Sequence, residues 1–150
     1  MKRAAAEPLR ILLIDPNEHG LVARRTVLDQ HGHKVTAVTG AQEGLEAFAA
    51  RPFDLVITKY RMAEVSGPQV IRKLRQQAPR VPIILLSGYV ETLSLTEKST
   101  GADVVLAKGP SEVRDLLRAI ARLSRRVAAK PPGRAGPSPR TGRRKGLTAS

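Results

Sequence analysis

The sequence contains no cysteine and no tryptophan, and only 3% of its residues are aromatic. The lack of cysteine excludes a disulfide framework, a thiolate metal site and a cysteine nucleophile, and it suits a reducing cytoplasm. So few aromatic rings argue against a surface on which nucleic-acid bases stack.

Long hydrophobic runs are also missing. The N-terminus, Met1-Lys2-Arg3, is basic, but the apolar run that follows covers only residues 11–14. This run is too short for the core of a signal peptide or for a membrane span. We therefore expect a cytoplasmic protein without a membrane span.

Acidic residues are absent from the last part of the chain. The 150 residues carry a net charge of +13, of which +7 lies before Ala129. The remaining +6 comes from a stretch rich in proline, glycine and serine, whose basic residues are Lys130, Arg134, Arg140, Arg143, Arg144 and Lys145. Such a composition buries too little apolar surface to fold. We predict an N-terminal extension (residues 1–9), one domain (10–129) and a basic disordered tail (130–150).

Short apolar runs predict the strands of this domain. Four of them, at residues 11–14, 55–57, 81–86 and 104–107, are typical of strands buried on both faces, and the alternating run 34–38 fits an outer strand. Helical spacing between the runs predicts helices, the first marked by Leu21, Val27 and Leu28 and ended by Gly32. The segment Thr39-Gly40-Ala41-Gln42 has capping-box spacing, followed by an apolar face of Ala41, Leu45, Phe48 and Ala49.

Three further helices complete the pattern. Val70, Ile71 and Leu74 mark one, and residues 90–100, rich in serine and threonine, predict a poor and soft helix. Ser111 can cap the last helix, whose apolar stripe is Val113, Leu116, Leu117, Ile120 and Leu123. Regular alternation of strand and helix predicts an α/β fold with a doubly wound, five-stranded parallel sheet. Its site should lie where the strands end, at Asp15-Pro16-Asn17, Thr58-Lys59-Tyr60, Ser87-Gly88 and Lys108-Gly109.

At these strand ends residues 10–126 resemble the receiver domain of two-component response regulators, which has a flavodoxin-like fold. Asp15 matches the first of the family's paired acids, Met62 and Gly67 match the turn after its third strand, and Ser87 and Lys108 match the ends of its fourth and fifth strands. The resemblance implies a module in phosphorelay signal transduction that works through protein partners.

Five positions depart from the family pattern: Lys59 replaces the phosphoacceptor aspartate, Pro16 the second acid, Ala63 the turn proline, Val105 the aromatic switch residue, and Gly109 the proline after Lys108. The family's chemistry needs a carboxylate nucleophile and a divalent cation. Here a single aligned carboxylate, Asp15, faces two ammonium groups, so the pocket has a formal charge of +1. We therefore predict no phosphoacceptor, no catalytic residue, no metal and no cofactor, unless Glu18 or Glu64 supplies a second carboxylate.

For the individual residues of this degenerate pocket we favour structural roles. Asp15 is expected to pair with Lys59 or Lys108, because a buried charge needs a partner. For Lys59 we favour this ion pair over a reactive amine. Ser87 is expected to bond to backbone, and His31 and His33 are expected to face solvent.

A basic band on the last helix is the strongest candidate for partner binding. Its arginines recur every four residues opposite the apolar stripe: Arg114, Arg118, Arg122 and Arg126, with Arg125 beside them.

The leading hypothesis is a non-enzymatic pseudo-receiver that binds an acidic protein without phosphorylation, and a homodimer stays an alternative. A second hypothesis is binding of nucleic acid or another polyanion through tail and helix. An enzyme is the weakest hypothesis, because no phosphate loop and no pair of nucleophile and base stand out.

Overall fold

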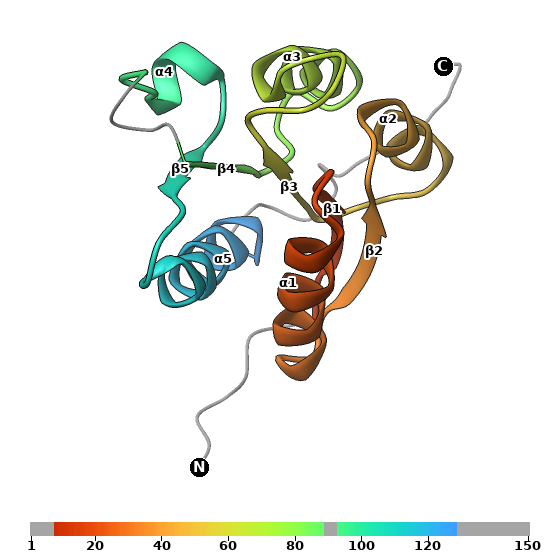
Figure 1. Ribbon diagram of the computed structural model, residues 1–150. Helices are drawn as coiled ribbons and strands as arrows, with labels where there is room; N and C mark the ends of the chain where they lie inside the picture. The colour runs from red at the N-terminus through yellow and green to blue at the C-terminus, as the bar shows by residue number, and fades with distance from the viewer. Residues whose placement is uncertain (1–7, 89–92, 129–150) are drawn as a thin grey trace, which may run out of the picture.

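The computed structural model describes residues 8–88 and 93–128. They form one parallel sheet in the order β2-β1-β3-β4-β5 (Figure 1). The strands are β1 (Arg10–Ile14), β2 (Lys34–Val38), β3 (Leu55–Lys59), β4 (Ile83–Ser87) and β5 (Val104–Ala107). The predicted fold class is confirmed, and β2 is an edge strand as expected. The fourth strand starts and ends later than the apolar run 81–86 suggested.

Five helices cover the two faces of the sheet (Figure 1). Helices α1 (Glu18–Gln30) and α5 (Glu112–Ala128) pack on one face. Helices α2 (Ala41–Ala50), α3 (Gly67–Gln77) and α4 (Glu97–Thr100) lie on the other. Because side chains alternate along each strand, the core divides into two apolar clusters. Ile11, Leu13 and Ile57 belong to the cluster beneath α1 and α5, and Leu12 and Val56 belong to the opposite one.

The start of α2 differs from the sequence prediction. The predicted capping box at Thr39 is wrong: the N-cap of α2 is Gly40, which makes no side-chain capping bond. The Thr39 hydroxyl instead donates to the Glu43 carboxylate at 3.3 Å. A complete capping box stands at α3, where Ser66 and Gln69 bond reciprocally.

The helix predicted over residues 90–100 is shorter in the structure. Residues 89–92 lie outside the described part of the chain, and the described remainder is helical only over Glu97–Thr100. This helix ends at Gly101, whose φ of +85° is a left-handed conformation that favours glycine. Two capping residues, Thr96 and Gly101, thus enclose a single turn.

In α5 the apolar stripe is shifted from its expected place. Leu116, Ile120 and Leu123 are buried as predicted, but Val113 is 45% exposed, and Ala119 contributes to the buried face. Ser111 precedes the helix, and its hydroxyl donates to the Asp115 carboxylate at 3.2 Å. The predicted tail, residues 130–150, lies outside the described residues. Within the described ranges, no helix is both long and apolar enough to cross a membrane.

Candidate functional site

The strand ends bring Asp15, Lys59, Ser87 and Lys108 to one edge of the sheet. Asp15 follows β1 directly and is fully buried, and Lys59 is the last residue of β3. Ser87 ends β4, and its carbonyl accepts a hydrogen bond from the Lys108 N–H at 3.1 Å. Because side chains alternate along a strand, Asp15 and Lys59 lie on the same face of the sheet as Leu13 and Ile57, which is the face that α1 covers. The predicted degenerate pocket is therefore assembled, with its carboxylate turned towards α1.

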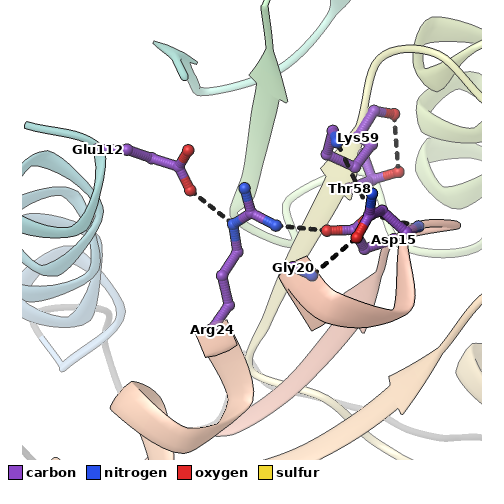
Figure 2. A network of polar contacts seen from close by, with 7 residues as sticks. Asp15, Gly20, Arg24, Thr58, Lys59 and Glu112 are labelled. Atoms are coloured by element: carbon purple, nitrogen blue, oxygen red, sulfur yellow. Dashed lines mark hydrogen bonds and ion pairs between the residues drawn. The ribbon is translucent and has the colours of Figure 1, made fainter. Parts of the chain in front are cut away.

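The main partner of Asp15 is Arg24, a residue of α1 that the sequence analysis did not single out. Its guanidinium contacts Asp15 Oδ2 through NH1 and donates from Nε to Glu112 Oε2 at 2.6 Å (Figure 2). Arg24 is only 7% exposed, and Glu112, at the start of α5, is also buried. One buried cation thus joins two buried carboxylates, which is the arrangement that buried charges require.

Lys59 is a secondary partner of Asp15. Its Nζ lies 3.7 Å from Asp15 Oδ1, an ion pair as expected but longer than a hydrogen bond. The same Oδ1 accepts the Asn17 N–H at 2.9 Å. Both carboxylate oxygens are therefore occupied by protein groups.

Gly20 leaves the space in which this network forms. A Cβ on Gly20 would lie 2.7 Å from Arg24 NH1 and 3.1 Å from Asp15 Oδ2. Such contacts are too close for a carbon atom, so a side chain here would displace the guanidinium. A glycine inside a helix costs stability relative to alanine, and this one has a packing reason.

Burial lowers the pKa of the Lys59 ammonium by penalising its charged form. The carboxylate of Asp15 opposes this shift, whereas the nearby cations Lys108 and Arg24 add to it. The site contains three formal positive charges, on Arg24, Lys59 and Lys108. It contains two formal negative charges, on Asp15 and Glu112. The site therefore has one cation more than it has carboxylates.

The donor set does not suit a magnesium ion. Magnesium prefers oxygen ligands in octahedral geometry, usually carboxylates and water. Here the single acid at the end of β1 is held by Arg24, its neighbour is Pro16, and Lys59 adds a positive charge. Glu18 and Glu64 are both exposed. Within residues 8–88 and 93–128, no three histidine or acidic side chains gather as a metal site.

A family model for the response regulator receiver domain matches residues 11–121. The chain belongs to the receiver domain family. This match runs from β1 into α5 and includes every residue of the site described above. Receiver domains are signalling modules of two-component systems.

Curated relatives extend well beyond this domain. The sensory/regulatory protein RpfC of Xanthomonas campestris is 34% identical over 128 residues, covering 81% of this chain but 17% of that protein. The gliding motility regulatory protein of Myxococcus xanthus is 31% identical over 126 residues, covering 80% of this chain and 16% of that protein. The chain thus spans less than a fifth of these two relatives.

Solved receiver domains match almost end to end. A receiver domain protein of Clostridium thermocellum is 29% identical with a TM-score of 0.70, covering 78% of this chain and 94% of that one. A CheY-like protein of Methanospirillum hungatei is 25% identical with a TM-score of 0.74, covering 81% and 98%. TrrA of Thermotoga maritima, solved with Mg²⁺ and beryllium fluoride, is 25% identical with a TM-score of 0.69, covering 76% and 97%.

The remaining predicted residues lie away from the pocket. Val105 is half-buried in β5, and its N–H donates to Glu97 Oε2 at 3.2 Å. The arginines of the basic band, Arg114, Arg118, Arg122 and Arg126, are all exposed on α5. A groove of about 510 Å³ runs between α5 and β5, and its lining includes Leu106, Arg118, Arg122 and Arg125.

Three residues were misjudged or missed from sequence. His33 is buried rather than solvated, and its Nδ1 accepts the Leu9 N–H at 3.1 Å. Arg24 and Glu112 were not singled out at all. The available signals were a basic residue inside the first helix and an acid at the start of the last helix. Neither signal indicates that the two residues form an ion pair.

Proposed function

We propose that this receiver domain signals without phosphoryl transfer, by binding a protein partner that presents acidic side chains. The observation that carries the proposal is the pocket itself: Lys59 stands in the place of the phosphoacceptor, and Arg24 neutralises Asp15. A carboxylate nucleophile and a free metal ligand are the two parts that the family's reaction needs. Here Lys59 replaces the nucleophile, Pro16 replaces one metal-binding acid, and Arg24 holds the remaining acid, Asp15.

The ion-pair network supports a pocket held in one arrangement. Arg24 links the strand end at Asp15 to Glu112 on α5, with all three side chains largely buried. Breaking a buried pair leaves a charge without compensation, so each alternative arrangement would be costly. A module of this kind would respond to the presence of its partner, not to a change inside the pocket.

The basic band is the surface that we assign to the partner. Exposed arginines repeat along α5 at Arg114, Arg118, Arg122 and Arg126, and the adjacent groove is lined by apolar residues, arginines and one acid, Asp115. Guanidinium groups bind carboxylates in a bidentate manner, and their stems cover apolar surface. An acidic peptide segment with a few apolar side chains fits both features.

The pocket is tested by mass spectrometry of the full chain after incubation with acetyl phosphate and magnesium. We expect no phosphoryl adduct, and a stoichiometric adduct would overturn the proposal. The same assay on a phosphorylatable receiver domain serves as the positive control. Magnesium titration followed by calorimetry should give no specific binding.

The partner surface is tested with a defined acidic probe. We expect poly-glutamate to bind the chain, and the double change Arg118→Glu with Arg122→Glu to weaken this binding strongly. Exchange of the exposed Arg72 and Arg80, which lie elsewhere on the molecule, for glutamate is the control that matches the change in charge. Equal weakening by both pairs would show that net charge alone matters. Sedimentation of the free chain tests the homodimer.

Polyanion binding is the alternative, supported by the net charge of +13 and the acid-free residues 130–150. If about six phosphates on duplex DNA are neutralised, log K should fall against log[salt] with a slope of roughly −5. Truncation after Ala129 should then abolish most binding. A slope near zero would exclude this electrostatic alternative, and a dependence on base sequence would contradict it as well.

A further inference from the structure

Lys59 differs from the other lysines of the described chain in its surroundings. Its side chain is only 11% exposed. The four other lysines within the described ranges are exposed: Lys34, Lys73, Lys98 and Lys108. Lys59 is thus the described lysine that has lost most of its hydration, and its side chain keeps a small exposed fraction.

The nearest carboxylate stabilises the Lys59 ammonium only in part. Asp15 Oδ2 contacts Arg24, and Asp15 Oδ1 accepts the Asn17 N–H, so the Lys59 Nζ is left at 3.7 Å. At that distance the attraction is a charge interaction without a hydrogen bond. Arg24 therefore takes the carboxylate that would otherwise hold Lys59 in its charged form.

A second ammonium, that of Lys108, comes from the other side of β4. Lys59 pairs with Leu86 of β4, and Leu86 pairs with Leu106 of β5, two residues before Lys108. Two strand spacings separate the backbones by roughly 10 Å, and lysine side chains on one face can meet across this distance. A neighbouring cation and partial burial both favour the uncharged, nucleophilic form of an amine. Burial and Lys108 both lower the pKa of Lys59.

We propose that Lys59 is an acylation site, at which its uncharged amine attacks the carbonyl carbon of a small acyl phosphate. The new bond joins Nζ to the acyl carbon, and the bond between that carbon and the phosphate oxygen breaks. Inorganic phosphate leaves with the electron pair, the amine loses a proton to solvent, and Lys59 becomes an amide. The Lys108 ammonium attracts the phosphate group and stabilises its departure.

The choice of reagent class follows from the charges of the site. With three cations against two carboxylates, the pocket attracts an anion, and a largely buried amine admits only a small one. An acyl phosphate combines an anionic group for Lys108 with an activated carbonyl for Lys59. The inference rests on the proposed function, because it takes Lys59 to be the nucleophile where the family has an aspartate.

The experiment treats the full chain with acetyl phosphate and without magnesium at neutral pH, and peptide mass spectrometry then gives the rate of acetylation at each lysine. We expect Lys59 to react several-fold faster than Lys34 and Lys73, with a rate that levels off at a lower pH. Lys108→Gln should slow the reaction of Lys59, whereas Lys73→Gln, a matched loss of one exposed charge, should leave it unchanged. Lys59→Arg should lose the modification while keeping the positive charge.

The possible contrary results would contradict different claims: the acylation of Lys59, the proposed function, or the role of the phosphate group. Acetylation of Lys59 at the rate of Lys34 and Lys73 would overturn this inference and leave the proposed function intact. A phosphoryl adduct, which has a different mass, would overturn the proposed function. The neutral reagent N-acetoxysuccinimide should show a weaker preference for Lys59, and an equal preference would overturn the role given to the phosphate group.

Discussion

Arg24 and Glu112 are 88 residues apart in the sequence, yet Arg24 Nε donates to Glu112 Oε2 at 2.6 Å. This pair joins the middle of α1 to the first turn of α5 (Figure 2). Since the same guanidinium contacts Asp15, the end of β1 is linked directly to the helix that carries the basic band. The pocket and the proposed partner surface are thus parts of one connected structure.

Arg24→Ala should lower the free energy of unfolding by about 3 kcal/mol, because it leaves the buried carboxylates of Asp15 and Glu112 without their shared cation. Urea denaturation measures this difference. Arg25→Ala is the matched control, since Arg25 is exposed and pairs only weakly with Asp29 at 3.8 Å. Its cost should stay below about 0.5 kcal/mol. Similar losses for the two variants would contradict the structural role of Arg24.

Gly20→Ala should affect stability more favourably when Arg24 is replaced by alanine than in the natural chain. In the natural chain the added Cβ displaces the Arg24 guanidinium and offsets the better helix propensity of alanine. In an Arg24→Ala background only the 3.1 Å approach to Asp15 Oδ2 remains, so more of the helix-propensity gain of alanine, up to about 1 kcal/mol, should appear as stability. A double-mutant cycle of unfolding free energies measures the coupling. Equal effects in both backgrounds would show that Gly20 is not needed for the network.

His33 should make stability fall in mild acid. Burial, followed by the charge of His31, lowers the pKa of His33 in the folded chain. An unfolded histidine takes up a proton near pH 6.5. Above that pH both states are neutral and the stability is fully present; below it the unfolded state binds more protons and stability is lost until the lower folded pKa is reached.

This effect is measured by urea denaturation between mildly alkaline and mildly acidic pH. His33→Asn, whose amide oxygen can accept the Leu9 N–H, should flatten the pH dependence. His31→Gln is the control at an exposed neighbour and should change the slope little. An unchanged slope in His33→Asn would refute the assignment to His33.

Lys59→Asp alone should not restore full phosphorylation by acetyl phosphate, because Pro16 still withholds the second metal-binding acid. The double change Lys59→Asp with Pro16→Asp should do better than either single change, since nucleophile and metal site act as a unit. Intact-mass spectrometry with magnesium present measures the adduct. Strong phosphorylation of Lys59→Asp alone would indicate that Glu18 or Glu64 moves inward to supply the missing carboxylate.

The sequence alone was enough to predict the fold and the strand-end residues of the pocket. Strand-length apolar runs such as residues 11–14 and 104–107 are local patterns, and their alternation with helices restricts the topology to a doubly wound sheet. The placement of Asp15, Lys59, Ser87 and Lys108 followed, because parallel strands end at one edge. Local capping was harder to predict. Thr39 has capping-box spacing, but its hydroxyl donates to the Glu43 side chain instead.

Only the tertiary structure decided which charges meet. Sequence reasoning paired Asp15 with a lysine of the pocket, but the packing of α1 and α5 on the same face brought Arg24 between Asp15 and Glu112. Likewise His33, next to a glycine in a polar stretch, became buried because its ring accepts the N–H of Leu9, 24 residues away. Such pairs depend on the rotation and position of whole helices and strands, which no local pattern contains. The sequence therefore contained the strand-end residues of the site, whereas the pairing of Asp15 and Glu112 with Arg24 depended on long-range packing.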